Sequence, residues 1–462
     1  MADPIRNQRQ PADLTEAEVD AAVACVDGLV GPRHGDARDI YETLTWGQGP
    51  GVLSQSGLQD WLWYRLPTKY LTDEPGYMGR FAGVAAALFD ALGLDRYAAI
   101  CRSTTTAGVH EAFDRSDAAG FAAMRKAVAD SGIDPPDLDD FAWGAVMGIE
   151  EANARAEVGI ALEGAIADGG FVVGRRGWRS RQRDVTARPL DSEHPVLPGQ
   201  SWRTAIVTER ISTWADAATT RSVDLGRRRA RVANHLLHPI APPPDLAERL
   251  QPMTWFLDVF GDAQPLTQAG YLNTAFLAHV HAAQPWADPF LEDRPPRTET
   301  DAVTLHRLRA RLEAMGALRK RGKVLERTAR GAGMAADPAA AWGSLTRKIS
   351  SDPWVRFAVE TCALLLVDLG RSAPVKDVTA AVARLAAEMG WRTSGGRAAG
   401  PDPSELAVLV AVRDAMAMFE LFGMLEEDGD WRHRHWTLTP AGTTTMLAIL
   451  REGAAGPRTR PW

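Results

Sequence analysis

The order of apolar segments in residues 254–331 constrains the fold of this chain more than any other feature of its sequence. Trp and Phe side chains within 255–260 predict a short apolar helix, and residues 264–267 indicate a short strand. Residues 269–281 predict a second helix, because their apolar side chains recur at three- and four-residue spacing.

A longer basic helix and a two-stranded hairpin are expected to follow. Residues 298–301, Thr-Glu-Thr-Asp, are typical of a helix N-terminus, and the leucines after them recur at helical spacing. We expect Gly316 to end this helix and Gly322 to form the turn between two short strands. Helix, strand, helix, longer helix and hairpin in this order is the plan of a winged-helix module, so we predict such a module here.

Residues 355–450 repeat the same order of expected elements. Both stretches carry Gly-x-Leu where the long helix meets the hairpin and Thr-x-x-Gly where the chain leaves it. These positions are Gly316, Leu318, Thr328 and Gly331 in the first stretch, and Gly423, Leu425, Thr439 and Gly442 in the second. Agreement of element order and of junctions predicts tandem winged-helix-like modules.

A third copy is suggested in the N-terminal half. Leu-Ser-Gln-Ser-Gly at 53–57 is similar to Leu-Thr-Gln-Ala-Gly at 266–270. We therefore expect an expanded version of the same plan around this segment.

We predict a mainly α fold, α with small β-hairpins, built as a multi-domain helical protein. A chain of 462 residues is too long for one simple core. The expected domains are an N-terminal helical domain at 1–140, a helix with a basic hairpin and an Arg-rich connector at 141–245, a first module at 246–350, and a second module at 351–462.

The apolar segments and the cysteines favour a cytoplasmic protein without membrane spans. The longest apolar run, which begins at Cys362, is far shorter than the eighteen or so residues that cross a bilayer. No secretory signal is visible at the N-terminus. Cys25, Cys101 and Cys362 are few and widely spaced, which fits buried thiols in a reducing compartment.

Charge is distributed unevenly along the chain. The net charge is -7, but residues 171–331 carry 25 Lys/Arg against 17 Asp/Glu, a balance of +8, which leaves -15 for the remainder. A basic middle region can attract a polyanion even when the total charge opposes it. A salt-bridged surface with a local excess of arginine is the alternative.

Double-stranded DNA is the polyanion that a winged-helix module would bind. A helix in the major groove needs side chains for base edges and cations for phosphates. The candidates in the first module are Arg307, Arg309 and Arg311 on the long helix and Arg319, Lys320, Arg321 and Lys323 on the hairpin.

Two further groups of arginines are candidates for the same partner. The first surrounds Trp178 and is expected on a basic hairpin, with strands at 171–173 and 184–186; an Arg-rich surface loop is the alternative. Its members are Arg175, Arg176, Arg179, Arg181 and Arg183. The second lies in the connector and comprises Arg227, Arg228 and Arg229.

The second module differs in charge. Residues 299–331 carry nine Lys/Arg against four acids, whereas residues 404–451 carry four Arg against seven acids. We expect the second module to contact another copy of the chain or a protein partner instead of DNA.

No motif predicts a cofactor, a metal or a catalytic site. The pair His235 and His238 could share a helical face, but a zinc site needs further ligands that the sequence does not place nearby. Asp139 and Asp140 are better explained by a helix N-terminus. An unrecognised enzyme would have to bring such residues, together with His110 and Glu111, into one pocket.

The segment from QPLTQAGYLNTAFL to LRARLEAMGALRKRGKVLERTARG carries a family resemblance. It resembles segments of uncharacterised winged-helix-containing proteins of high-GC bacteria, some of them associated with plasmids and transposons. Leu-Thr-Gln-Ala-Gly and Gly-Ala-Leu-Arg-Lys carry the resemblance, which covers roughly residues 245–350. It implies a winged-helix-like module in a bacterial mobile-element or defence context, and no established activity.

The leading hypothesis is therefore a DNA-binding accessory or regulatory protein. The alternative is a protein–protein interaction scaffold built from winged-helix modules, since one fold serves many functions. An unrecognised enzyme is the third.

Overall fold

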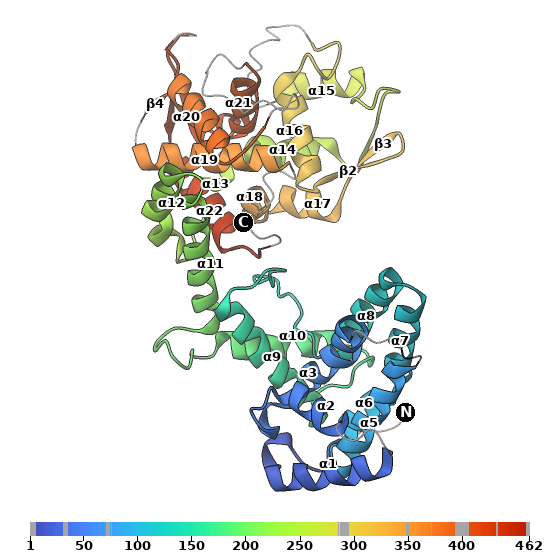
Figure 1. The fold of residues 1–462 in the computed structure, drawn as a ribbon. Helices are drawn as coiled ribbons and strands as arrows, with labels where there is room; N and C mark the ends of the chain where they lie inside the picture. The colour runs from blue at the N-terminus through green and yellow to red at the C-terminus, as the bar shows by residue number, and fades with distance from the viewer. Residues whose placement is uncertain are drawn as a thin grey trace. The chain divides into compact units, whose positions relative to one another are not determined.

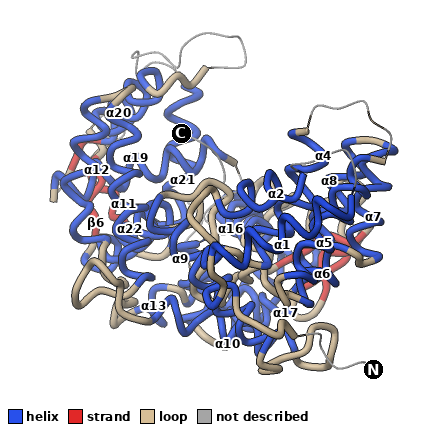
Figure 2. The backbone as a smooth tube through the Cα atoms, turned by 60° about the horizontal axis from the view of Figure 1, so that its bottom comes forward, coloured by secondary structure: helices blue, strands red, loops and turns tan. Residues whose placement is uncertain are grey.

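The computed structural model describes residues 6–30, 36–70, 74, 76–284, 286, 295–347, 352–370, 372–392, 406–430 and 433–458. The described chain is mainly helical and contains two small antiparallel sheets, as Figures 1 and 2 show. It forms two compact units. The first contains residues 1–206 with 457–461, and the second contains residues 207–456.

Helices build the first unit. They are α1 (Glu16–Val30), α2 (Asp36–Thr45), α3 (Gln55–Asp60), a π-helical turn (Trp61–Arg65), α4 (Leu66–Lys69), α5 (Tyr77–Ala91), α6 (Asp95–Cys101), α7 (Thr104–Arg115), α8 (Asp117–Ser131), α9 (Ile149–Ala167) and α10 (Trp178–Asp191). Side chains of α1 to α8 share one apolar core, and a smaller core joins α9 to α10. The next helix, α11 (Trp202–Thr219), runs across the boundary between the units.

The second unit repeats one order of elements. After α12 (Val223–Leu236) and α13 (Leu246–Arg249), the first repeat contains α14 (Gln251–Phe260), β1 (Ala263–Pro265), α15 (Thr274–Ala283), α16 (Val303–Ala314), β2 (Leu318–Arg321), β3 (Val324–Arg327) and α17 (Ala329–Ala336). After α18 (Pro338–Arg347), the second contains α19 (Pro353–Leu369), β4 (Ala373–Pro374), α20 (Val375–Glu388), α21 (Leu406–Leu421), β5 (Leu425–Asp428), β6 (His435–Leu438) and α22 (Pro440–Ala455).

Both repeats form a three-stranded antiparallel sheet with the same topology. The orders are β1-β3-β2 and β4-β6-β5, so the first strand of each hairpin is an edge strand. In the hairpins, Leu318 pairs with Arg327 and Leu425 pairs with Leu438. One apolar core, which extends from α11 to α22, contains buried side chains of both repeats. The finer domain boundaries inside each unit remain predictions.

The shared junction residues perform the same task in both repeats. Thr328 accepts a hydrogen bond from the Gly331 N–H at 3.1 Å, and Thr439 accepts one from the Gly442 N–H at the same distance. Each threonine therefore caps the helix that follows its hairpin. Glycine is needed three residues later, because an added Cβ at Gly442 would lie 1.8 Å from the carbonyl oxygen of Met424.

The basic hairpin predicted for residues 171–186 is wrong. Residues 184–186 lie inside α10, and the described residues of the first unit form no paired strands beyond an isolated bridge between Glu193 and Ser201. Gln182, Thr186 and Leu190 are buried at four-residue spacing and place α10 against the unit. The arginines recur at every second position, which is the period of a strand. The buried residues recur at every fourth position, which is helical, and they determine the structure.

The third copy of the strand-containing plan is also not found among the described residues of the first unit. Ser54 accepts a hydrogen bond from the Gly57 N–H at 3.1 Å and begins α3. In the second unit, Thr267 instead accepts from the Tyr271 N–H at 3.1 Å, within a turn at Gly270. The two similar segments thus adopt different local structures.

We expect Gly442→Ala to destabilise the second unit by about 2 kcal/mol or more, because the new methyl group must displace the Met424 carbonyl. Gly453→Ala in the same helix is the control: its added Cβ meets nothing within 4 Å, and the change should stabilise by up to about 1 kcal/mol. Urea unfolding followed by circular dichroism measures both, and equal effects would contradict the close approach.

Candidate nucleic-acid interface

The β2–β3 hairpin exposes a cluster of cationic side chains. Its apolar residues Leu318 and Leu325 are buried and fix the hairpin to the core. The remaining residues of β2 and the turn face solvent, so the cations at this edge are Arg319, Lys320, Arg321 and Lys323. We call these four residues the basic edge.

One carboxylate partly compensates the basic edge. Glu326 lies opposite Arg319 in the sheet, and its oxygens are 3.5 Å from the Arg319 guanidinium and 3.9 Å from that of Arg321. The two arginine side chains are 65% and 75% exposed, so these loose pairs exchange readily for another anion. Four cations and one carboxylate leave a net charge of +3 on this part of the surface.

The corresponding edge of the second repeat has the opposite charge. In β5 the three residues after the buried Leu425 are Glu426, Glu427 and Asp428, and the burial pattern along the strand is the same as in β2. Glu427 accepts from the indole N–H of Trp436 and pairs with two arginines. The two hairpins therefore share a backbone plan and present surfaces of different chemistry.

Arg309 on α16 is engaged inside the protein. The side chain is 7% exposed, and its guanidinium donates to Glu299 at 2.5 Å, to Glu313 at 2.7 Å and to the carbonyl of Gly270 at 3.0 Å. Glu299 is itself fully buried and also accepts from the Leu272 N–H. The predicted contact of Arg309 with a phosphate is incompatible with this network.

Helix α16 packs against α21, and Arg307 and Arg311 of α16 lie near Asp414 of α21. The Nε of Arg307 is 2.8 Å from a carboxylate oxygen of Asp414 on α21. Burial lowers the pKa of Arg311, and the negative charge of Asp414 opposes this shift. Alanines 310 and 314 are the most exposed residues of α16, and Arg307, Arg309 and Arg311 each have a carboxylate nearby.

The arginines around Trp178 remain on the surface of the first unit. They lie on α10 and in the loop before it, and Arg175, Arg176, Arg179, Arg181 and Arg183 are all exposed. The Arg183 guanidinium is 3.0 Å from Asp139. Trp178 stacks on Phe171 with ring centroids 6.4 Å apart, and the Arg179 guanidinium lies over the Trp178 ring, 4.5 Å from its centroid. The indole thus has a packing role within the unit.

Two of the three connector arginines hold α12 in place. Arg228 pairs with Asp368 on α19 at 2.9 Å. Arg229 is buried, pairs with Glu360 at 2.6 Å and stacks over Trp214 at 4.7 Å. Arg227 is exposed. Only this last member of the group faces solvent.

The structure also places residues that the sequence offered as metal ligands or catalytic groups. Within the described ranges, no three His, Cys, Asp or Glu side chains are grouped so that they could hold a metal ion. His110 is buried, its Nε2 lies 2.9 Å from the Leu62 carbonyl, and burial lowers its pKa. In the same part of the chain, no helix is both long and apolar enough to cross a membrane.

We expect Arg309→Met and Arg319→Met to separate structural from surface arginines. The first substitution leaves the buried Glu299 carboxylate without its guanidinium and should destabilise the protein by about 3 kcal/mol. The second removes an exposed cation and should change stability by less than about 0.5 kcal/mol. Urea unfolding of both variants checks this, and a stable Arg309→Met protein would refute the structural role.

Comparison of the chain with models of protein families, with curated proteins and with solved structures finds no match. The function must therefore be inferred from the residues and the geometry of the chain itself.

Proposed function

We propose that the two repeats are winged-helix modules and that the chain binds double-stranded DNA through the basic edge of the first one. The element order helix–strand–helix–helix–hairpin and the strand order of each sheet support the modules. The observation that carries the binding proposal is the exposure of four cations on one edge strand and its turn. In this role the protein is a bacterial DNA-associated accessory or regulatory factor.

The contact is electrostatic and independent of base sequence. Lysine and arginine that neutralise phosphates release condensed counterions, which makes binding weaken as salt rises. The long helix does not read bases, because Arg307 and Arg311 face α21 and Arg309 is buried. A hairpin that follows the phosphate backbone needs no such helix.

A cytoplasmic location fits the thiols. All three cysteines are unpaired. Cys25 is exposed, so the expectation of a buried thiol is wrong at that position. Cys101 and Cys362 are buried, and burial raises the pKa of each to about 12. Such thiols stay protonated and inert in a reducing compartment.

We expect fluorescence anisotropy to detect binding of a duplex at low salt, with a log–log salt slope of roughly −3.6 for four phosphate contacts. The variant Arg319→Glu with Lys320→Glu removes two contacts and should reduce the magnitude of the slope by roughly 1.8. Lys126→Glu with Lys376→Glu is the matched control, because it reverses two exposed charges elsewhere on the chain. Absence of binding at low salt, or equal slopes in both variants, would refute the proposal.

A protein–protein scaffold is the second candidate function, favoured by the acidic edge strand β5. Glu426 and Asp428 are exposed there, at positions equivalent to two cations of the basic edge. A second copy of the chain could therefore join its basic edge to this acidic one, since both strands lie at sheet edges.

We expect sedimentation velocity without DNA to distinguish the two candidates. If the scaffold is the main function, the protein self-associates at low salt, and Glu426→Lys with Asp428→Lys abolishes the association by like-charge repulsion. A monomer at every salt concentration would remove self-association and leave DNA binding through the basic edge.

A further inference from the structure

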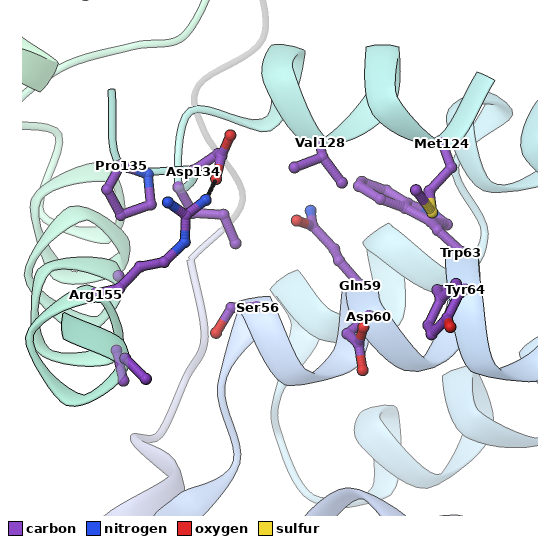
Figure 3. A pocket seen from close by; sticks show the side chains of 14 residues that line it. Ser56, Gln59, Asp60, Trp63, Tyr64, Met124, Val128, Asp134, Pro135 and Arg155 are labelled. Atoms are coloured by element: carbon purple, nitrogen blue, oxygen red, sulfur yellow. Dashed lines mark hydrogen bonds and ion pairs between the residues drawn. The ribbon is translucent and has the colours of Figure 1, made fainter. Parts of the chain in front are cut away.

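The first unit contains a cavity that has no part in the DNA proposal. Its volume is about 590 Å³, within the range of sites that bind small molecules. Residues of α3 and the π-helical turn form its floor, α8 forms one wall and α9 the other, and the segment at 133–135 closes one end. Figure 3 shows these side chains around the open space.

Most of the cavity wall is apolar and held in place. Trp63 is buried, and its indole N–H donates to Oγ1 of Thr106 at 3.0 Å, which fixes the ring. Met124 and Val128 project from α8 on the opposite side, as Figure 3 shows. A preformed apolar surface of this kind favours an apolar ligand body, because little must be ordered on binding.

Gln59 is the polar group that opens into the cavity. Its residue is only 6% exposed, and its side chain points into the space between α3 and α8 in Figure 3. No hydrogen bond to its amide is found among the residues that the structure describes. Its amide nitrogen and oxygen are not enclosed by protein atoms, so this amide is open to water or to a group that enters the cavity. It offers a carbonyl acceptor and an NH₂ donor side by side.

The charges near the cavity are already paired. Asp134 and Arg155 form an ion pair at one end, shown as a dashed line in Figure 3. Asp60 accepts from Nε of Arg65 at 2.6 Å. Since neither sign is left in excess by these pairs, a charged ligand would lose its hydration without gaining a new counterion.

We propose that this cavity binds an uncharged, largely apolar small molecule that carries an amide or a comparable adjacent donor and acceptor. The apolar body packs against Trp63, Met124 and Val128. The amide exchanges two hydrogen bonds with Gln59. Ligand binding here would make the first unit a small-molecule-binding unit, independent of whether the basic edge binds DNA.

Gly159 on α9 allows the cavity to be filled without a clash. The residue is buried and lines the cavity, and an added Cβ would meet nothing within 4 Å. Replacement by leucine projects a side chain into the open space and also improves helix propensity. Gly164 on the same helix is exposed, is likewise free of close neighbours and lies outside the cavity, so Gly164→Leu is the matched control.

The test uses the full chain and two uncharged fluorescent probes, 2-naphthamide and 2-methylnaphthalene. We expect 2-naphthamide to bind saturably at one site, Gly159→Leu to weaken it at least tenfold, and Gly164→Leu to leave it unchanged. Gln59→Leu removes both hydrogen bonds to the ligand amide, so it should weaken 2-naphthamide roughly thirtyfold and spare 2-methylnaphthalene.

Three results would overturn the proposal: no saturable binding, equal affinity in both glycine variants, or equal effects of Gln59→Leu on the two probes. Circular dichroism confirms that each variant folds. If Gly159→Leu does not fold, Ala156→Leu fills the same cavity from an exposed lining position of α9 and gives the same readout.

Discussion

One apolar core serves both repeats of the second unit, and the placement of the charged side chains follows from it. Because the core extends from α11 to α22, the long helices α16 and α21 are brought into contact. Arg307 then meets Asp414, and Arg309 meets the fully buried Glu299. Burial of apolar surface is the dominant driving force, and buried charges must be paired once it has set the packing. The arginines of the basic helix α16 are thereby engaged with carboxylates, whereas the four cations of the β2–β3 hairpin lie on the surface.

The two hairpins show that the fold leaves the charge of the hairpin surface unspecified. Each is fixed by alternate apolar residues, Leu318 and Leu325 in one and Leu425 and Trp436 in the other. The outward positions do not take part in the core, so their charge can vary without a change in backbone plan. Three cations of β2 and three acids of β5 occupy equivalent positions for this reason. Any difference in partner between the repeats therefore resides in these outward residues.

The parts that sequence reasoning predicted depend on local signals, and those that it missed depend on distant contacts. The mainly helical fold with two small hairpins is confirmed. It could be predicted because Gly316 and Thr328, like their counterparts in the second repeat, act on residues close to them in the chain. Charge counts located the exposed cations of β2 but could not distinguish them from Arg309, whose partner Glu299 lies ten residues away in the chain and across a turn. The cavity was invisible in the same way, since its walls come from three separate segments.

The sequence of α3 and the π-helical turn contains one local signal of the cavity. Leu58, Trp61, Leu62 and Leu66 form the buried stripe of α3 and its extension, and Trp63 is out of phase with that stripe yet is also buried. An amphipathic helix normally buries one apolar stripe, so a buried side chain outside that stripe indicates a second packing surface. Here the Leu66 N–H donates to the Trp61 carbonyl five residues back, and such π-helical turns are frequent at functional sites. Gln59 and Trp63 both line the cavity, and Trp63 also belongs to the apolar core of the first unit, so this part of the helix joins the cavity to the core.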